Sequence, residues 1–515
     1  MLSSIWFWIV SILVLVAIRD VFFQKKHSIT HNFPIVGHLR YWLEKIGPEI
    51  RQYIVANNRE ELPFNRQERS WIYASSKKDN NLQGFGSDQD FNAPGYIFIK
   101  NAMIGYNPPT DHPFNKNPGV MPAAKIMGEY HHRRRPYRPY SIINISGMSF
   151  GSLSAKAIES LNKGADLAGC FHNTGEGSLS PYHQNGADVI LNIGTAYFGV
   201  RNVDGNFSME KLKEKVEQNP FLRAIELKLS QGAKPGKGGM LPGSKINDEI
   251  AAIRLIPKGK DAMSPAFHTA FSNIPEMVKF IESMAEETGL PVGIKSAIGK
   301  LEQWEELAAY MVKTNSGPDF ITIDGGEGGT GAAPHAFADH VSMPFTFAFA
   351  KIYQIFQRHN LTDKIFFIAS GKLGFAEKAL MAFAMGADSI NIAREAMMSI
   401  GCIQAQKCHT NHCPSGVATS NKWLQAGIDP QLKSERFYNY HRSLVKEIAE
   451  ISHACGYEHP SQMTMEDIEL SMGDNNRTMS LTKTMGYHKN PIKYEGLEKI
   501  IKCPHLGGQN ARNRL

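Results

Sequence analysis

Short runs of apolar residues alternate with segments of helical periodicity from about residue 141 onward, and most of the runs end in Gly, Ser or Asn. Parallel strands that are covered on both faces appear in a sequence as such short apolar runs, whereas half-exposed strands alternate apolar and polar positions. Eight runs predict strands, at residues 142–145, 170–173, 189–193, 224–229, 292–295, 320–323, 366–369 and 389–392.

Helical segments between these runs give repeated strand–helix units of the α/β class. Eight such units over about 250 residues favour a (β/α)8 TIM barrel, and a doubly wound parallel sheet is the main alternative. In a barrel, the functional groups lie at the C-terminal ends of the strands and in the loops that follow them. The strand ends are therefore the first place to look for chemistry.

The first residues carry a different pattern. Residues 5–18 form an almost unbroken apolar run, which residues 21–23 extend, and Lys25 and Lys26 follow it. A helix that crosses a membrane needs about 20 such residues, and basic residues after it favour a cytoplasmic location for the rest of the chain. A secretory signal would have basic residues before the run and a small-residue cleavage site after it. We predict a single-pass anchor over residues 1–26, and a buried core helix is the alternative.

Three further regions follow the anchor. Residues 27–140 form a mixed, polar lead-in segment that includes an amphipathic stretch at 41–57, and residues 141–425 form the barrel. Residues 426–515 have a helical texture, with an amphipathic segment at 434–455, and are predicted to form a helical C-terminal extension.

Composition and charge exclude several classes of protein. Of 515 residues, 42% are hydrophobic and 20% charged, an ordinary globular balance that excludes a disordered, collagenous or polytopic membrane protein. The net charge of +7 is modest, and part of it lies in the run HHRRR from His131 to Arg135. No nucleic-acid recognition motif accompanies this run. We therefore expect a solvated or phosphate-facing surface there and no nucleic-acid partner.

Glycine-rich segments follow most of the predicted strands. They include SGMSFGS after the first strand, NTGEGS after the second, QGAKPGKGG after the fourth, DGGEGGTGAAP after the sixth and SGKLG after the seventh. Glycine lets backbone N–H groups approach an anion or a planar ring closely, and barrels commonly bind a phosphate after strands seven and eight. The G-x-G-x-x-G and P-loop motifs are absent. The pattern favours a phosphate-bearing cofactor, and flavin mononucleotide (FMN) fits better than a nicotinamide or a nucleoside triphosphate.

Three of the six cysteines form a compact motif, C-x5-C-x4-C-P, at Cys402, Cys408 and Cys413. Clustered cysteines in a large enzyme-like chain are typical of metal ligands in a reducing compartment. Zinc usually takes four ligands, and His409 or His412 is a candidate for the fourth. The wide spacing and the Cys-Pro ending favour an iron–sulfur site.

Taken together, SGMSFGSLS, NTGEGS, ELKLSQGAKPGKGGMLPG, DGGEGGTGAAP and the cysteine motif, in this order, resemble the FMN-binding synthase domain of glutamate synthases. The resemblance covers residues 141–450. It implies a TIM barrel that holds FMN and a 3Fe–4S cluster, although the residues alone leave a 4Fe–4S cluster open. It also implies the condensation of ammonia with 2-oxoglutarate to 2-iminoglutarate, which reduced FMN converts to L-glutamate.

The resemblance also assigns roles to individual residues. Lys295 and Glu176 match catalytic positions beside the flavin and the substrate, with Glu176 suited to proton transfer. Cys402, Cys408 and Cys413 match the cluster ligands. The positions that match the FMN site are Ser146, Met148, Ser149, Asn173, Lys228, Gln231, Lys295, Gly325, Gly326, Gly328, Gly329 and Gly371, and Arg394 lies in the predicted phosphate region.

The sequence also departs from full-length glutamate synthases. It has no N-terminal glutaminase cysteine, no glycine-repeat β-helix and no nicotinamide module. We therefore expect ammonia or another amine as the nitrogen source and a separate protein or carrier as the electron donor. A homo-oligomer is compatible with the sequence.

Two alternatives to an aminating enzyme remain. One is a related FMN and iron–sulfur oxidoreductase that acts on another small molecule or amine, for example in N-alkylglutamate formation. The other is a non-catalytic electron-relay subunit. The presence of Glu176 and Lys295 argues against a relay, which needs neither a proton-transfer group nor a cation beside a substrate.

Overall fold

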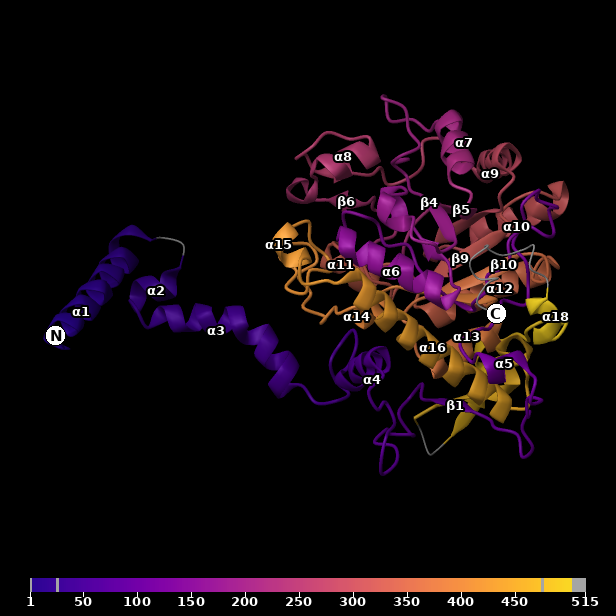
Figure 1. Ribbon diagram of the computed structural model, residues 1–515, viewed down its shortest axis with the longest axis horizontal. Coiled ribbons are helices and arrows are strands. Elements are labelled where there is room, and N and C mark those ends of the chain that lie inside the picture. Colours follow the sequence, from indigo (N-terminus) through magenta and orange to yellow (C-terminus); the bar gives the residue numbers. More distant parts are fainter. Residues whose placement is uncertain (1, 25–26, 474–476, 503–515) are drawn as a thin grey trace. The chain divides into compact units, whose positions relative to one another are not determined.

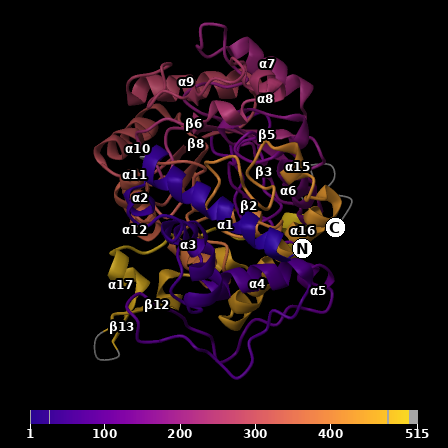
Figure 2. The ribbon, with the colours of Figure 1, turned by 90° about the vertical axis from the view of Figure 1, so that its left-hand side faces the viewer.

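The computed structural model describes residues 2–24, 27–473 and 477–502, and the chain forms two compact units, residues 1–70 and 71–515. The second unit contains a closed barrel of eight strands in the order β2-β3-β4-β5-β8-β9-β10-β11, with every neighbouring pair parallel (Figures 1 and 2). The strands are β2 (Ile143–Ile145), β3 (His172–Asn173), β4 (Val189–Ile193), β5 (Leu222–Lys228), β8 (Val292–Ser296), β9 (Phe320–Asp324), β10 (Phe366–Ser370) and β11 (Ser389–Ile392). All eight predicted strands are present, and the doubly wound alternative is wrong.

Helices surround the strands on the outside of the barrel (Figure 2). Local sequence explains where they start and stop: Ser154 accepts a hydrogen bond from the third residue of α6, and Gly169 ends that helix at φ +67°. Asn273 and Gly289 do the same for α9. The main helices are α6 (Ala155–Ala168), α7 (Met209–Gln218), α8 (Asp248–Arg254), α9 (Ile274–Thr288), α10 (Glu302–Thr314), α11 (His335–His340), α12 (Phe345–Arg358), α13 (Ala376–Met385), α14 (Arg394–Ser399) and α16 (Pro430–Ala454).

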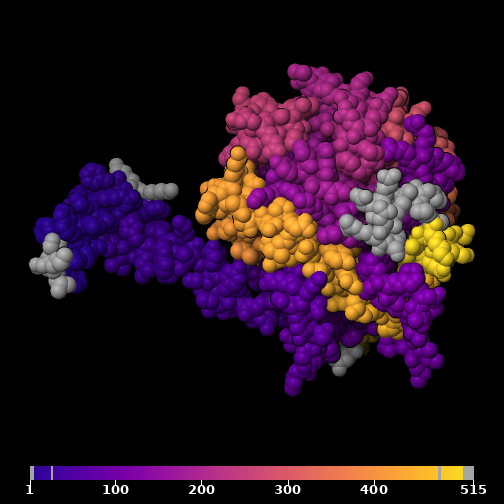
Figure 3. All heavy atoms as spheres, in the orientation of Figure 1, coloured from indigo at the N-terminus to yellow at the C-terminus, as the bar shows by residue number. Residues whose placement is uncertain are grey.

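One connection departs from the predicted alternation. Between β3 and β4 the chain forms only two 3-10 turns, Gly175–Gly177 and Pro181–His183. The segment is rich in Gly, Ser and Pro, which oppose a helix. The long helix α16 packs extensively on α6 and stays visible as a ridge on the outer surface (Figure 3).

The N-terminal end of the barrel is closed by the segment that precedes β2. Ala123, Met127 and Tyr137 are fully buried in one apolar cluster with strand residues such as Phe320 and Phe366. The predicted boundaries at 140 and 425 both fall inside the second compact unit, and they stay predictions about sequence regions.

The basic run HHRRR belongs to this closed end. Arg133 Nε donates to Asp319 Oδ2 at 2.9 Å, and its Nη1 donates to Glu282 Oε2 at 2.6 Å. His131 contacts the same aspartate at 2.8 Å. Only 9% of the Arg133 side chain is exposed. The expectation of a solvated or phosphate-facing surface is therefore wrong for Arg133, because two carboxylates of the chain itself neutralise it.

The C-terminal region is helical only in part. The amphipathic segment at 434–455 lies within α16 up to Ala454, and Cys455 caps the helix. Beyond it, β12 (Ile468–Ser471) pairs with both β1 (Ile97–Ile99) and β13 (Thr478–Ser480) in an antiparallel sheet, before the short helices α17 (Leu481–Met485) and α18 (Leu497–Ile501). The prediction of a helical extension is therefore wrong for β12 and β13, which lie beyond Ala454.

The first unit consists of helices. These are α1 (Leu2–Ile18) with a π-helical turn at Arg19–Phe23, then α2 (Ser28–Asn32), α3 (Gly37–Ile50) with a second π-helical turn at Arg51–Val55, and the start of α4 (Arg66–Lys77). Within the described part of the chain, Ile5–Phe23 is the one candidate for a membrane span by length and composition. Lys25 and Lys26, on which the predicted orientation depends, lie outside the described residues.

Candidate active site

Polar side chains stand at the C-terminal ends of four consecutive barrel strands. Lys228 ends β5, Lys295 is next to last in β8, Asp324 ends β9 and Ser370 ends β10. The register pairs Lys228 with Lys295 and Asp324 with Ser370, and the second pair lies two residues further along, because Lys295 is opposite Thr322. This is the end at which barrels carry their ligand-binding groups.

Lys295 is a buried cation with an anionic partner in the protein. Its Nζ lies 3.7 Å from Asp324 Oδ2 and donates to Ser146 Oγ at 3.4 Å, while 8% of its side chain is exposed. Asp324 is fixed in turn by the Gly232 amide at 2.8 Å and the Ser370 hydroxyl at 2.7 Å. Burying an unpaired ammonium costs several kcal/mol, so Asp324 stabilises Lys295 in place. Sequence reasoning missed Asp324. Both contacts of the ammonium are long, which leaves it capacity for a further acceptor.

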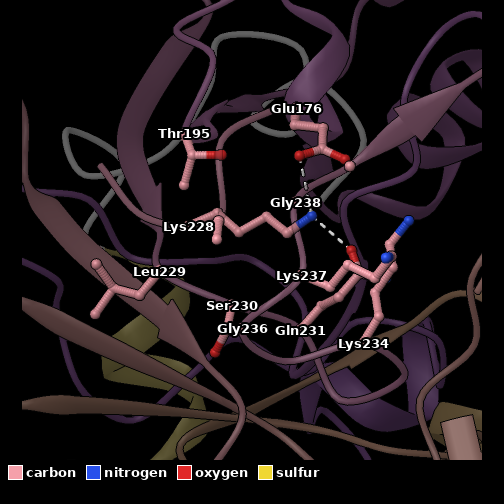
Figure 4. Close-up of a pocket in the computed structure, with 12 residues that line it drawn as sticks. Glu176, Thr195, Lys228, Leu229, Ser230, Gln231, Lys234, Gly236, Lys237 and Gly238 are labelled. Atoms are coloured by element: carbon pink, nitrogen blue, oxygen red, sulfur yellow. Dashed lines mark hydrogen bonds and ion pairs between the residues drawn. The ribbon is translucent and has the colours of Figure 1, made fainter. Parts of the chain in front are cut away.

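A pocket opens beside these strand ends, between the loop after β3 and the loop after β5 (Figure 4). The Lys228 ammonium lies between the Glu176 carboxylate, at 3.2 Å, and the Gln231 side-chain oxygen, at 2.5 Å. Lys234 and Lys237 line the same pocket, and Lys234 Nζ donates to the Ala332 carbonyl at 3.0 Å. Three residues predicted from the sequence, Glu176, Lys228 and Gln231, thus meet in one place.

Positive charge dominates this pocket and sets the ionisation of its carboxylate. Burial raises the pKa of Glu176, but the charges of Lys228, Lys234 and Arg254 together outweigh burial and hold that pKa below its ordinary value. Burial lowers the pKa of Lys234, and Glu176 opposes that shift. Glu176 is therefore ionised at neutral pH and is surrounded by more positive than negative groups.

Arg254, at the end of α8, is a site residue that sequence reasoning missed. Its Nη2 donates to the Phe150 carbonyl at 2.7 Å and to Ser149 Oγ at 3.3 Å, and 3% of the residue is exposed. Burial lowers its pKa to about 10, against the influence of Glu176. Arg254 thus ties the loop after β2 to the pocket. It lies in the long excursion between β5 and β8, where no motif distinguishes it from a surface arginine.

His268 is a second site residue that the sequence did not reveal. Its Nε2 donates to the Lys228 carbonyl at 2.9 Å, and its Nδ1 lies 3.1 Å from the Tyr197 hydroxyl. Burial lowers the pKa of His268 to about 4. A neutral imidazole therefore supports the strand end that carries Lys228.

The loops after β2 and β3 pack backbone against backbone. A Cβ at Gly175, where φ is +62°, would lie 2.6 Å from the Ser149 amide nitrogen, so this contact requires glycine. Asn173 is fully buried, and its Nδ2 donates to Glu226 Oε1 at 2.8 Å inside the barrel. Met148 is also buried. The structure thus brings Met148, Ser149 and Asn173 together beside Ser146 at the mouth.

The predicted phosphate region also comes together. Arg394 at the start of α14 donates a hydrogen bond to the Glu327 carbonyl, and a Cβ at Gly329 would lie 2.7 Å from Arg394 Cδ. Gly371, at φ +148°, faces Phe345, whose amide donates to Glu327 Oε2 at 2.8 Å. The glycine loop after β9, which contains Gly325, Gly326 and Gly328, therefore lies against the ends of β10 and β11.

The three cysteines lie in the loop after α14. Burial, together with the nearby Cys408 and Cys413, raises the pKa of the Cys402 thiol to about 12. The ammonium of Lys245, which is 3% exposed, donates to the Cys408 carbonyl at 2.8 Å and to the Ser152 carbonyl at 3.4 Å. Lys245 thereby joins the cysteine loop to the loop after β2.

Within residues 2–24, 27–473 and 477–502, no three His, Cys, Asp or Glu side chains converge closely enough to hold a single metal ion. A zinc site with His409 or His412 as the fourth ligand has no support in this geometry. The three thiols lie near enough to one another that Cys408 and Cys413 raise the pKa of Cys402, and Cys413 raises that of Cys408.

Comparison with known proteins identifies the family. Residues 122–458, well over half of the chain, match the family described as the conserved region in glutamate synthase. The chain is 40% identical to the glutamate synthase large subunit-like protein YerD of Bacillus subtilis over 86% of this chain and 90% of that protein. It is 35% identical to the archaeal glutamate synthase [NADPH] of Methanocaldococcus jannaschii, over 61% of this chain and 59% of that protein.

A solved structure of flavocytochrome b2 with sulfite bound covers 85% of the chain at 12% identity, with a TM-score of 0.41, which is too low to carry an argument. The assignment rests on the family match and on the relatives in sequence. This protein belongs to the glutamate synthase family.

Proposed function

We propose that this protein reductively aminates 2-oxoglutarate with ammonia, through 2-iminoglutarate, to give L-glutamate. Membership of the glutamate synthase family supports an oxidoreductase of this type. The observation that carries the proposal is the pocket in which one ionised carboxylate, Glu176, is surrounded by Lys228, Lys234 and Arg254. A pocket with excess positive charge suits a substrate with two carboxylates.

In this proposal, the cations of the pocket orient the substrate, and its carboxylate transfers protons. Lys234 is buried and held at one position by the Ala332 carbonyl, so it is suited to orient a substrate carboxylate. Glu176 is ionised and accepts a proton from the attacking amine as nitrogen bonds to the keto carbon. It passes this proton to the keto oxygen, which becomes a hydroxyl, and then moves a second proton from the nitrogen to that hydroxyl, which leaves as water. Lys228 keeps Glu176 in position for both steps.

The same mouth fits FMN. Ser146, Met148, Ser149, Asn173, Lys228, Gln231 and Lys295 would lie near the ring. The loop with Gly325, Gly326, Gly328 and Gly329 would lie beside the cofactor, and Gly371 and Arg394 would hold its phosphate. Lys295 has a spare N–H for an anionic acceptor, which supports this assignment. When bound, FMN supplies the electron pair that reduces the imine carbon. Asp324 pairs with Lys295 and holds it in place at the strand end.

Cys402, Cys408 and Cys413 would hold an iron–sulfur cluster, and three ligands favour 3Fe–4S. Such a cluster carries single electrons when bound. Lys245 stabilises the loop between the thiols and the loop after β2, so the two regions keep a fixed separation. An iron content of the purified protein near three per chain would support 3Fe–4S, and four would favour 4Fe–4S.

The N-terminal segment Ile5–Phe23 is proposed as a single-pass membrane anchor, with the barrel unit in the cytoplasm. Its length of 19 residues corresponds to about 28 Å of helix, close to the thickness of the hydrocarbon core. A membrane location suits a separate electron donor, either a protein or a carrier. A homo-oligomer is compatible with this arrangement.

A second candidate function uses the same cofactors on a different amine, which would yield an N-alkylglutamate. The chain spans only 59% of the length of the archaeal relative, so the activity of that relative does not fix the amine used by this chain. The electron-relay alternative is disfavoured by the Glu176–Lys228 ion pair in an open pocket, for which a relay has no use.

The test uses protein purified without oxygen, photoreduced, and mixed with ammonium and 2-oxoglutarate while flavin absorbance is recorded. We expect reoxidation only when both substrates are present, with glutamate as product. Reoxidation with 2-oxoglutarate and methylamine but not ammonium would favour the second function. Flavin that stays reduced in the presence of every amine and oxo acid, in protein with full FMN and iron content, would overturn the aminating function.

A further inference from the structure

Helix α3 presents an apolar face that the rest of its unit leaves uncovered. Leu39 is 54% exposed, Trp42 56% and Leu43 46%, and Ile50 lies further along the same face. The spacing of these residues, at i, i+3, i+4 and i+11, puts them on one side of a helix. Tyr53 and Ile54, exposed in the π-helical turn that follows, continue the face.

The opposite side of α3 is charged. Arg40, Glu44 and Lys45 are exposed, and Arg40 forms an ion pair with Glu44 one turn away. Their angular positions on the helix lie outside the arc that the apolar residues occupy. Such a helix, with a wide apolar face and a mixed charged face, is typical of segments that lie in the plane of a membrane interface.

Contacts within the first unit hold the start of α3 at the end of the apolar span. Asp20, in the last turn of the candidate span, is fully buried. It lies 2.7 Å from His38 Nε2 at the start of α3 and accepts a hydrogen bond from the Ile35 amide at 3.2 Å. If the span crosses the bilayer, α3 therefore begins at the level where the hydrocarbon ends.

We propose that α3 lies on the bilayer surface, with the face formed by Leu39, Trp42, Leu43 and Ile50 inserted among the lipid headgroups and the first acyl carbons. This inference rests on the proposed membrane anchor and goes beyond it, because a span alone needs no second lipid contact. Trp42 and Tyr53 support a lipid partner, since amphipathic aromatic rings are enriched at membrane interfaces. The direct connection to the span brings this partner within reach of α3.

The test places a photoreactive p-benzoylphenylalanine at single positions of the full-length protein, reconstituted in vesicles of phosphatidylcholine and phosphatidylglycerol. Leu43 on the apolar face and Glu44 on the charged face form a matched pair, since both side chains are exposed and adjacent in sequence. Val10 in α1, 55% exposed, serves as the control for the span. Lipid adducts, intramolecular crosslinks and crosslinked dimers are then separated by mass spectrometry and gel electrophoresis.

We expect lipid adducts at Val10 and Leu43, with at least five-fold fewer at Glu44. Lipid adducts at Val10 with none at Leu43 would leave the anchor intact and overturn the interfacial placement of α3. Crosslinks from Leu43 to the barrel, or to a second copy, would also overturn it and identify the true occupant of the face. Equal labelling at Leu43 and Glu44 would contradict an oriented helix, and an absence of lipid adducts at Val10 as well would remove the anchor too.

Discussion

Charged side chains lie at both ends of the barrel, but the two ends differ in how positive and negative side chains are paired. At the closed end, the Arg133 guanidinium binds two carboxylates, Asp319 and Glu282, so the positive charge of Arg133 is fully paired within the protein. At the open end, Glu176 is outnumbered by the cations around it. A balanced buried network needs no ligand and contributes to the stability and specificity of the fold. An unbalanced one leaves positive charge that an anionic ligand can neutralise. The balance of charge, more than its density, therefore distinguishes a binding end from a structural end.

The largest expected effect is on catalysis at the open end. Glu176→Gln removes the proton-transfer group but keeps its size, so we expect the turnover number for glutamate formation to fall by about 10²- to 10⁴-fold. The measurement is anaerobic turnover with ammonium and 2-oxoglutarate. Glu282→Gln is the matched control, because it removes a carboxylate from the balanced network at the other end. Equal losses of activity in the two variants would contradict the division between the ends.

At the closed end, we expect a substitution to lower the stability of the fold and to leave substrate binding unchanged. Arg133→Met leaves the fully buried Asp319 without its main cation, and breaking a buried ion pair in this way costs about 3–5 kcal/mol. We expect a clear drop in Tm, with the KM for 2-oxoglutarate unchanged at a temperature where the variant is folded. A stable variant with a raised KM would show that the closed end also takes part in binding.

The sequence predicts the barrel because its signals are local and repeated. Each apolar run marks one strand, and all eight strands are found within two residues of the predicted positions. The meeting of Glu176 with Lys228 and Gln231 could also be expected, since each residue follows a strand and strand ends share one rim. The resemblance to a known family supplied the roles of these residues, which spacing alone does not give.

Other features could not be predicted because they depend on partners distant in the chain. Arg254 lies 78 positions from Glu176 (254 − 176), and nothing local marks it as buried. Asp324 opens the segment DGGEGGTGAAP, but that motif does not reveal its pairing with Lys295. For the same reason, the sequence does not distinguish Arg133 from a surface arginine, because its partners Asp319 and Glu282 lie far along the chain. The fine assignments of FMN contacts and cluster ligands stay predictions.

A smaller change, in the KM for 2-oxoglutarate, would show whether the lysines of the pocket bind the substrate. Lys234→Met removes a buried ammonium, so we expect the KM for 2-oxoglutarate to rise by about 10- to 100-fold, from the loss of a charged contact worth about 1.5–3 kcal/mol. Lys237 lines the same pocket but is exposed, and Lys237→Met should raise the KM far less. A fall in the turnover number with no change in KM for Lys234→Met would instead place this lysine in the chemical step.

The last expected effect concerns the pH dependence of stability at the open end. Burial lowers the pKa of His268 to about 4 in the folded protein, from 6.5. Between pH 6.5 and 4, the unfolded chain therefore binds a proton at this histidine that the folded chain does not, and the free energy of unfolding falls as the pH falls. His268→Gln keeps a donor for the Lys228 carbonyl but removes this titration. We expect the pH dependence of the free energy of unfolding, measured with urea at several pH values, to become shallower by about 1.4 kcal/mol per pH unit in this range. An unchanged slope would mean that His268 is accessible to protons, and that the support beneath Lys228 opens readily to water.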